Sequence, residues 1–150
     1  MARLLIVAHA PLASALAEVA AHTYADCAAS VQALDVTPEM GPEQVQALAL
    51  QLLPQAEPGE TLILTDVFGA TPCNAAQRLA DGVHVRVVTG VNVPMLWRTL
   101  CYLDEPLDML VSRALAGATQ GVMQAGASRP QQQARGAGPE DAEDQRNHHQ

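Results

Sequence analysis

His9 is the first residue of this 150-residue chain whose type and position could do chemistry. It follows the apolar run "RLLIVA" at residues 3–8, which is typical of a buried strand, and the segment after it has the apolar spacing of a helix. Unpaired N–H groups at the amino terminus of a helix attract anions, and an imidazole placed there can act as a nucleophile toward phosphorus. The alternative is a partly buried histidine that bonds to the backbone and has no chemical role.

Asp66 is the natural partner of such a histidine, because it directly follows the apolar run "TLILT" at residues 61–65. A carboxylate that binds one ring nitrogen fixes the tautomer, leaves the lone pair of the other nitrogen free and stabilises positive charge on the ring. The sequence therefore predicts a His9–Asp66 pair. A helix cap or a turn residue is an equally good interpretation of Asp66 from the sequence alone.

The segment "FGATPCN", which begins at Phe68, predicts a phosphate-binding loop that leads into a helix. Gly69 permits tight backbone geometry, Thr71 suits the N-cap and Pro72 suits the first helical position. The Thr71 hydroxyl and the amides around Ala70 could hold phosphate oxygens, as phosphoryl transfer requires. A plain capped helix is the alternative, because the segment is neither a P-loop nor a dinucleotide-binding fingerprint.

Predicted strands and helices alternate along the chain. Strands are expected at 3–8, 30–36, 61–65 and 83–90, and helices at 12–28, 42–53, 71–82, from 94 onward and from 105 to between 117 and 121. This alternation predicts an α/β domain with a mainly parallel four-stranded sheet and helices on both faces, a doubly wound arrangement. In such sheets ligands gather at the carboxyl ends of the strands. We therefore expect His9, Asp66 and Gly90–Asn92 to meet at one edge.

The chain is expected to form one domain over residues 1–128, followed by a polar tail at 129–150. The tail contains no Leu, Ile, Val, Phe, Tyr or Trp, so it cannot bury enough apolar surface to offset the entropy of ordering. We expect the tail to be disordered and to hold no second domain.

Composition excludes several classes of function. The formal net charge is −8 and lysine is absent, so nucleic acid is not an expected partner. Cys27, Cys73 and Cys101 form no CxxC pair, and we expect them to be small apolar residues of a reduced, cytoplasmic protein. No apolar run is long enough to cross a bilayer, and His22 and His84 have no metal-ligand spacing.

A serine hydrolase is a weaker alternative. Ser14, His9 and Asp66 have the residue types of a catalytic triad. However, Ser14 lies inside a predicted helix rather than on the GxSxG elbow that presents a nucleophilic serine. His84 lies on a predicted strand, where we expect a surface or edge position.

Three segments resemble the IIA component of the mannose family of the bacterial phosphoenolpyruvate-dependent sugar phosphotransferase system. They are "LLIVAHAPLASAL", "TDVFGATPCNAA" and "TGVNVPML", and the similarity extends over about residues 2–120. The resemblance implies that His9 accepts a phosphoryl group from the phosphocarrier protein HPr. It also implies that Asp66 orients His9 and that Thr71 lies near the phosphate.

The resemblance further implies a supporting loop that contains Gly90, Asn92 and Pro94 near the active edge. It implies transfer of the phosphoryl group to a IIB component, a homodimer, no cofactor and no metal, and contact with the membrane only through partner proteins. It leaves open whether the segment "GVMQAG" at 121–126 forms an additional edge strand that is exchanged between the subunits.

The sequence departs from the family pattern at three places. Ala10-Pro11 follows the histidine in place of glycine, Gly69-Ala70 stands where two glycines are common, and Cys73 stands where many members have an aromatic residue. None of these departures removes a group that does chemistry.

The function predicted from the sequence is that of a stand-alone phosphocarrier, a phosphotransferase that forms a phosphohistidine at His9 and serves either sugar transport or regulation. One alternative is a non-catalytic regulatory module whose partner binding depends on the phosphorylation state of His9. Another is a small-molecule binder that uses the same crevice without covalent chemistry.

Overall fold

The computed structural model describes residues 1–55 and 59–126, so the predicted tail at 129–150 and its boundary lie outside the described residues. The elements, in chain order, are β1 (Arg3–His9), α1 (Leu12–Thr23), the 3-10 helix η1 (Ala25–Ser30), β2 (Val31–Val36), α2 (Pro42–Leu52), β3 (Thr61–Thr65), α3 (Thr71–Gln77), β4 (Val85–Thr89), α4 (Val93–Cys101) and α5 (Leu107–Gln120).

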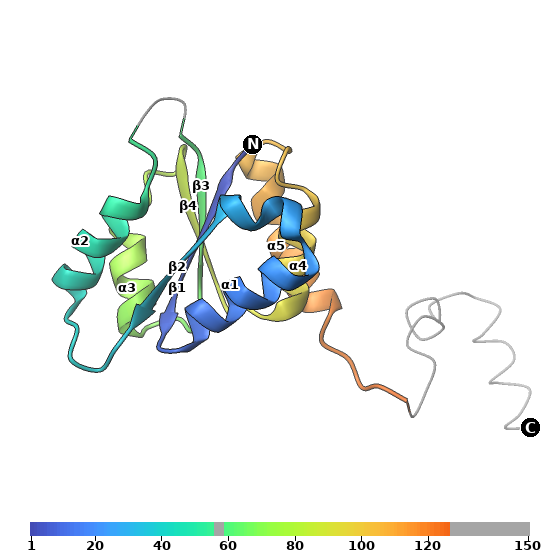
Figure 1. The fold of residues 1–150 in the computed structure, drawn as a ribbon, viewed down its shortest axis with the longest axis horizontal. Helices are drawn as coiled ribbons and strands as arrows, with labels where there is room; N and C mark the ends of the chain where they lie inside the picture. Colours follow the sequence, from blue (N-terminus) through green and yellow to red (C-terminus); the bar gives the residue numbers. More distant parts are fainter. Residues whose placement is uncertain (56–58, 127–150) are drawn as a thin grey trace, which may run out of the picture.

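The four strands form one parallel sheet in the order β2-β1-β3-β4. The chain moves from β1 outward to β2 and then returns to the other side of β1 for β3, so the topological switch point lies between β1 and β3. The carboxyl ends of the strands lie at the lower edge of the sheet in Figure 1. The predicted α/β fold with a parallel four-stranded sheet is confirmed.

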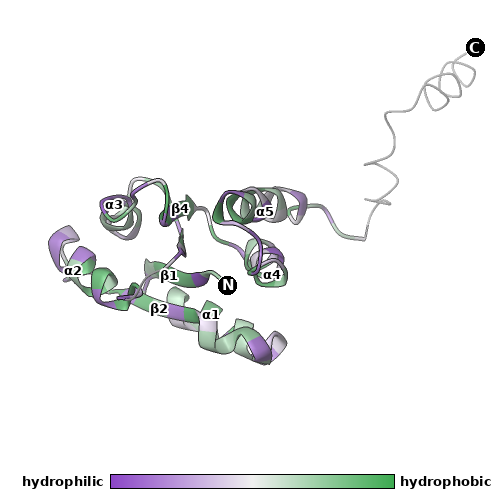
Figure 2. Ribbon diagram, turned by 90° about the horizontal axis from the view of Figure 1, so that it is seen from above, coloured by the Kyte–Doolittle hydropathy of each residue, from purple (hydrophilic) through white to green (hydrophobic). Residues whose placement is uncertain are grey.

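Helices cover both faces of the sheet, as Figure 2 shows: α2 and α3 lie on one side and α1, α4 and α5 on the other. Successive side chains of a strand point to opposite faces, so a strand in the middle of this sandwich is buried on both faces and mostly apolar. Residues 4–8 of β1 and 61–65 of β3 are indeed all buried. This explains why both strands appear in the sequence as continuous apolar runs.

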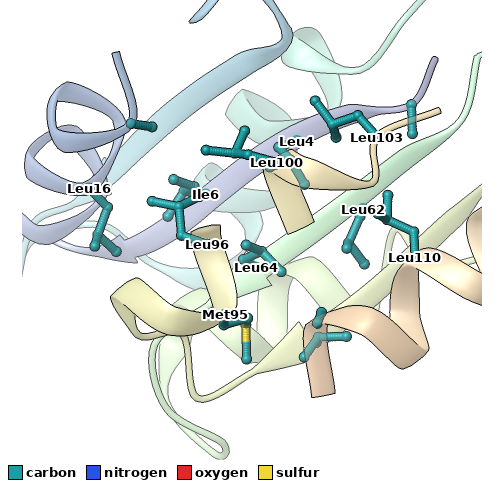
Figure 3. Close-up of a cluster of buried hydrophobic side chains, with 14 of the residues drawn as sticks. Leu4, Ile6, Leu16, Leu62, Leu64, Met95, Leu96, Leu100, Leu103 and Leu110 are labelled. Carbon is teal, nitrogen blue, oxygen red and sulfur yellow. The ribbon is translucent and has the colours of Figure 1, made fainter. Parts of the chain in front are cut away.

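The larger of the two hydrophobic clusters lies between the sheet and the helices α1, α4 and α5 (Figure 3). Its fully buried large side chains are Leu4, Ile6, Leu62, Leu64, Met95, Leu96 and Leu110. The opposite cluster is smaller and includes Leu5, Val7, Val45, Ala49, Ile63, Ala75 and Ala76. Both clusters hold the carboxyl ends of β1 and β3 in fixed positions.

Helix α1 ends at Thr23, so the predicted helix over residues 12–28 is too long. Tyr24 leaves the helical conformation, with φ −126° and ψ 63°, and its ring packs edge-on against Trp97 at a centroid distance of 5.5 Å. This contact with α4 overrides the local helical pattern, and the chain continues as a 3-10 helix.

Helix α3 is also shorter than predicted, because it ends at Gln77 rather than near Gly82. The backbone bonds that follow it are of the i→i−3 type, and the Asp81 carboxylate accepts the N–H groups of Val83, His84 and Val85. The amides of residues 83 and 84 are hydrogen-bonded in this turn, so β4 begins at Val85 and not at residue 83.

The segment "GVMQAG" forms no strand within the described residues. Gly121 ends α5 and lies against Pro94 so closely that a Cβ atom there would be 2.2 Å from the Pro94 Cβ. The sheet of the described part therefore has four strands, and the exchanged edge strand is not confirmed. In the same part of the chain, no helix has the length and apolar character that crossing a membrane requires.

Candidate active site

The structure brings together His9 and Asp66, which stand 57 positions apart in the sequence. His9 is the last residue of β1 and Asp66 directly follows β3, the neighbouring strand at the switch point. One carboxylate oxygen of Asp66, Oδ2, lies 2.7 Å from Nδ1 of His9 and accepts the backbone N–H of His9 at 3.0 Å. Two hydrogen bonds to one residue fix both the position and the rotation of the imidazole.

The two side chains differ in exposure. The Asp66 side chain is 12% exposed and the His9 side chain is 53% exposed. Burial raises the pKa of the Asp66 carboxyl group, but the hydrogen bonds from the His9 amide and ring, the charge of His9 and the Val67 amide together hold that pKa below its ordinary value. Asp66 is therefore an ionised acceptor at neutral pH.

The ionised carboxylate determines the tautomer of the neutral His9 ring. A carboxylate without a proton can only accept, so Nδ1 must carry the hydrogen and Nε2 must carry the lone pair. Among the hydrogen bonds of residues 1–55 and 59–126, none involves Nε2. The exposed ring can therefore present a nucleophilic nitrogen to an electrophile from solvent or from a partner protein.

The loop after Asp66 leads into α3 at the same edge of the sheet. Gly69 has a φ of +89°, a conformation that favours glycine. Ala70 is the N-cap and Thr71 the first helical residue, so the predicted N-cap role of Thr71 is wrong: the chain is already extended at Ala70 and helical at Thr71. In the described part of the chain no hydrogen bond joins Thr71 to His9, and its phosphate-binding role stays a prediction.

The loop after β4 is tied to the site through the backbone. The Val91 N–H donates to the Thr65 carbonyl oxygen at 2.9 Å, immediately before Asp66. Asn92 caps α4, because its Oδ1 accepts the Met95 N–H at 2.8 Å, and Pro94 follows within the first turn. Asn92 and Pro94 of the predicted supporting loop thus have clear structural roles, and neither is hydrogen-bonded to His9 among the described residues.

Asp35 is a residue of this edge that the sequence analysis missed. It lies on β2 beside Ala8, and its carboxylate accepts the Ser14 N–H at 2.9 Å and the Ser14 hydroxyl. The Ser14 hydroxyl therefore serves Asp35 and not His9, which argues against the hydrolase triad. The available signal was a single carboxylate in the strand "SVQALDV", since a partly buried charged group needs a partner.

The Asp35 contact also changes the expected role of α1. The sequence analysis places a free helix amino terminus beside His9, but the first-turn amide of Ser14 already binds a carboxylate. The anion-attracting capacity of α1 is therefore partly used within the protein. Across the residues that the structure describes, no group of three or more His, Cys, Asp and Glu side chains is placed to hold a metal ion.

The site therefore consists of an exposed, carboxylate-bound histidine at the switch point of a parallel α/β sheet. The profile of the EIIA-man family, described as "PTS system fructose IIA component", matches residues 3–111. The chain belongs to this family. The resemblance seen in the three sequence segments is therefore confirmed.

Two relatives show how far the sequence similarity extends. The sorbose-specific EIIA component of the phosphotransferase system of Lacticaseibacillus casei is 34% identical over 97 residues, which cover 62% of this chain and 67% of that protein. The mannose-specific EIIAB component of Escherichia coli K12 is 42% identical over 64 residues, 41% of this chain. The match covers only 20% of the length of the E. coli protein.

Solved structures share the fold. A mannose/sorbose-specific IIA subunit from Enterococcus faecalis aligns with a TM-score of 0.76 at 24% identity, over 85% of this chain and 97% of that one. The phosphotransferase system component EIIA from Streptococcus agalactiae aligns with a TM-score of 0.73 at 22% identity, over 83% of this chain and 97% of that one. At these identities the similarity supports the fold alone.

Proposed function

We propose that this chain is a phosphocarrier of a sugar phosphotransferase system, with His9 as the residue that carries the phosphoryl group. The observation that carries the proposal is the 2.7 Å contact of Nδ1 with Asp66 on a ring that is 53% exposed. This arrangement leaves Nε2 as the nucleophile. Membership in the EIIA-man family supports the same chemistry.

The proposed step exchanges one P–N bond for another. The Nε2 lone pair of His9 attacks the phosphorus of a phosphohistidine on the donor, HPr. The bond between phosphorus and the donor nitrogen breaks, and the donor ring keeps the electron pair. The positive charge that develops on the His9 ring is stabilised by the Asp66 carboxylate, which holds the Nδ1 hydrogen throughout.

The phosphoryl oxygens would be held by the loop that follows Asp66. Gly69, Ala70 and Thr71 are the proposed phosphate-binding residues, with the amides and the Thr71 hydroxyl as donors. Asn92 and Pro94 act indirectly in this proposal, since they fix the start of α4 beside the site. The transfer requires no cofactor and no metal.

The surroundings of the site suit a protein donor better than a small molecule. Val67 and Phe68, which follow Asp66, are 50% and 71% exposed and offer apolar surface beside an exposed histidine. We propose HPr as the donor, a IIB component or a regulatory target as the acceptor, a homodimeric state and a location in the cytoplasm.

The proposal is tested by incubating the full chain with phosphoenolpyruvate, enzyme I and HPr. We expect one acid-labile phosphoryl group per chain, seen as an intact-mass increase, and its complete loss in His9→Ala. His22→Ala is the matched control, because His22 is an exposed histidine at the other end of α1. Label that persists in His9→Ala, or that disappears in His22→Ala, would contradict the assignment.

A further inference from the structure

Two cysteines that are far apart in the sequence lie close together between η1 and α4. The Cys101 thiol, at the end of α4, donates to the Tyr24 hydroxyl at 3.5 Å. The Cys27 sulfur on η1 lies 4.0 Å from the carbonyl oxygen of Leu100. That oxygen and the Cα of Cys101 belong to the same planar peptide unit, so the Cys27 sulfur lies within about 7 Å of the Cys101 Cα.

Both thiols raise the pKa of the Tyr24 hydroxyl group. Its pKa is raised above the ordinary value, first by the hydrogen bond with Cys101, then by burial, and further by the charges of Cys101 and Cys27. Both sulfur atoms therefore act on the same hydroxyl group. Tyr24, in turn, is held by its edge-on contact with Trp97 of α4, which keeps the two elements packed together.

The third cysteine provides an internal contrast. Cys73 is buried on α3, with 1% of its surface exposed, and it packs on the other face of the sheet. Cys101 is exposed and lines a surface groove between α4 and α5, and Cys27 is half-buried. Only Cys27 and Cys101 combine access to solvent with proximity to each other.

We propose that Cys27 and Cys101 form a dithiol that a peroxide oxidises to an intramolecular disulfide, fastening η1 to α4. The Cys101 thiolate attacks one peroxide oxygen, the O–O bond breaks, and a sulfenic acid forms with release of one water molecule. The Cys27 thiolate then attacks the Cys101 sulfur, which forms the S–S bond and releases a second water molecule. Two thiols lose two electrons and two protons, and one peroxide is reduced to two waters.

Cys101 is the last residue of α4 and lines a groove that also contains Arg98, whose guanidinium is hydrogen-bonded to Gln120. The proposed reaction is stoichiometric, because each chain is oxidised once. This modification site is independent of His9 and of the proposed function.

The test treats the full chain with hydrogen peroxide and then blocks the remaining thiols under denaturing conditions. We expect the monomer mass to fall by about 2 Da before blocking, the loss of two hydrogens. Peptide mapping should recover a single linked pair that joins Cys27 to Cys101, with Cys73 blocked as a free thiol. Cys27→Ser and Cys101→Ser should each abolish the mass loss, and Cys73→Ala should keep it.

Other products would overturn the proposal. They are oxygen added to Cys101 without a disulfide in the wild type, a disulfide that joins two chains, or a linked peptide that contains Cys73. The wild-type peptide map decides between these outcomes by itself, so the test does not depend on how well the variants fold.

Discussion

Two carboxylates at the carboxyl edge of the sheet, Asp66 and Asp35, bind their neighbours in closely similar ways. Asp66 accepts the backbone N–H and the ring Nδ1 of His9, and Asp35 accepts the backbone N–H and the hydroxyl of Ser14. Each carboxylate thus holds one residue by its main chain and its side chain together. Asp66 directly follows β3 and Asp35 is the penultimate residue of β2, and both strands pair with β1.

The two pairs differ in whether the residue that the carboxylate binds keeps a free polar atom. An imidazole has two nitrogens, so the bond to Asp66 leaves one of them with a free lone pair. A serine hydroxyl has one hydrogen, and its donation to Asp35 uses the proton that a general base would have to remove. A similar pair of hydrogen bonds therefore leaves one ring nitrogen of His9 unbonded at Asp66 and closes the first turn of α1 at Asp35.

The largest expected difference between the Asp66–His9 pair and the Asp35–Ser14 pair is in the rate of phosphoryl transfer. Asp66→Asn should lower the rate of transfer from phosphorylated HPr about 10- to 100-fold, because the amide cannot hold the Nδ1 hydrogen and stabilise the ring charge as the carboxylate does. Rapid-quench measurement of phosphorylated chain gives the rate. Asp35→Asn is the matched control and should accept the phosphoryl group at nearly the wild-type rate. Equal losses of rate in both variants would contradict a special role of Asp66.

The next largest effect is on the free energy of unfolding, and it is expected for a substitution of Asp35. Asp35→Ala should lower the free energy of unfolding by about 1 kcal/mol, since it removes a carboxylate that caps the first turn of α1. Urea denaturation followed by circular dichroism measures the change. An Asp35→Ala variant that is as stable as the wild type would show that this corner contributes nothing to the fold.

A smaller effect is expected for the serine itself. Ser14→Ala keeps the backbone bond to Asp35 and loses only the hydroxyl bond, so it should cost about 0.5 kcal/mol and leave phosphoryl transfer unchanged. The same denaturation and rapid-quench assays apply. Loss of phosphoryl transfer in this variant would mean that Ser14 has a chemical role that the structure does not indicate.

The smallest expected effect is a pH dependence of the contribution that Asp66 makes to the free energy of unfolding. The folded pKa of Asp66 is lowered from 3.8, so its contribution to stability is fully present above that value and is lost as pH falls through the folded pKa. The difference in unfolding free energy between wild type and Asp66→Asn should therefore shrink between about pH 5 and about pH 3. A difference that stays constant or grows over this range would contradict the depressed pKa.

Much of the fold follows from local sequence features. Residues 4–8 and 62–64 are all apolar because helices cover both faces of β1 and β3, and this pattern is visible without a structure. His9 and Asp66 stand directly after these runs, so the parallel sheet alone implies that they share an edge. The 2.7 Å contact is a consequence of adjacency in the sheet, which the alternation of elements favours.

The errors arise where a distant contact decides the local structure. The end of α1 depends on the packing of Tyr24 against Trp97 on α4. The sequence pattern of residues 12–28 does not predict that contact. The end of α3 depends on three amides that bind Asp81. The Asp35–Ser14 bond and the meeting of Cys27 with Leu100 likewise join residues that only the folded chain brings together.

The most direct test of the central claim is the protonation and phosphorylation state of the two His9 ring nitrogens. Long-range proton–nitrogen NMR correlations on the nitrogen-labelled chain distinguish Nδ1 from Nε2, both before and after phosphorylation. The account predicts hydrogen on Nδ1 in the free protein and a phosphoryl group on Nε2 after reaction. Hydrogen on Nε2 with none on Nδ1, or a phosphoryl group on Nδ1, would contradict it.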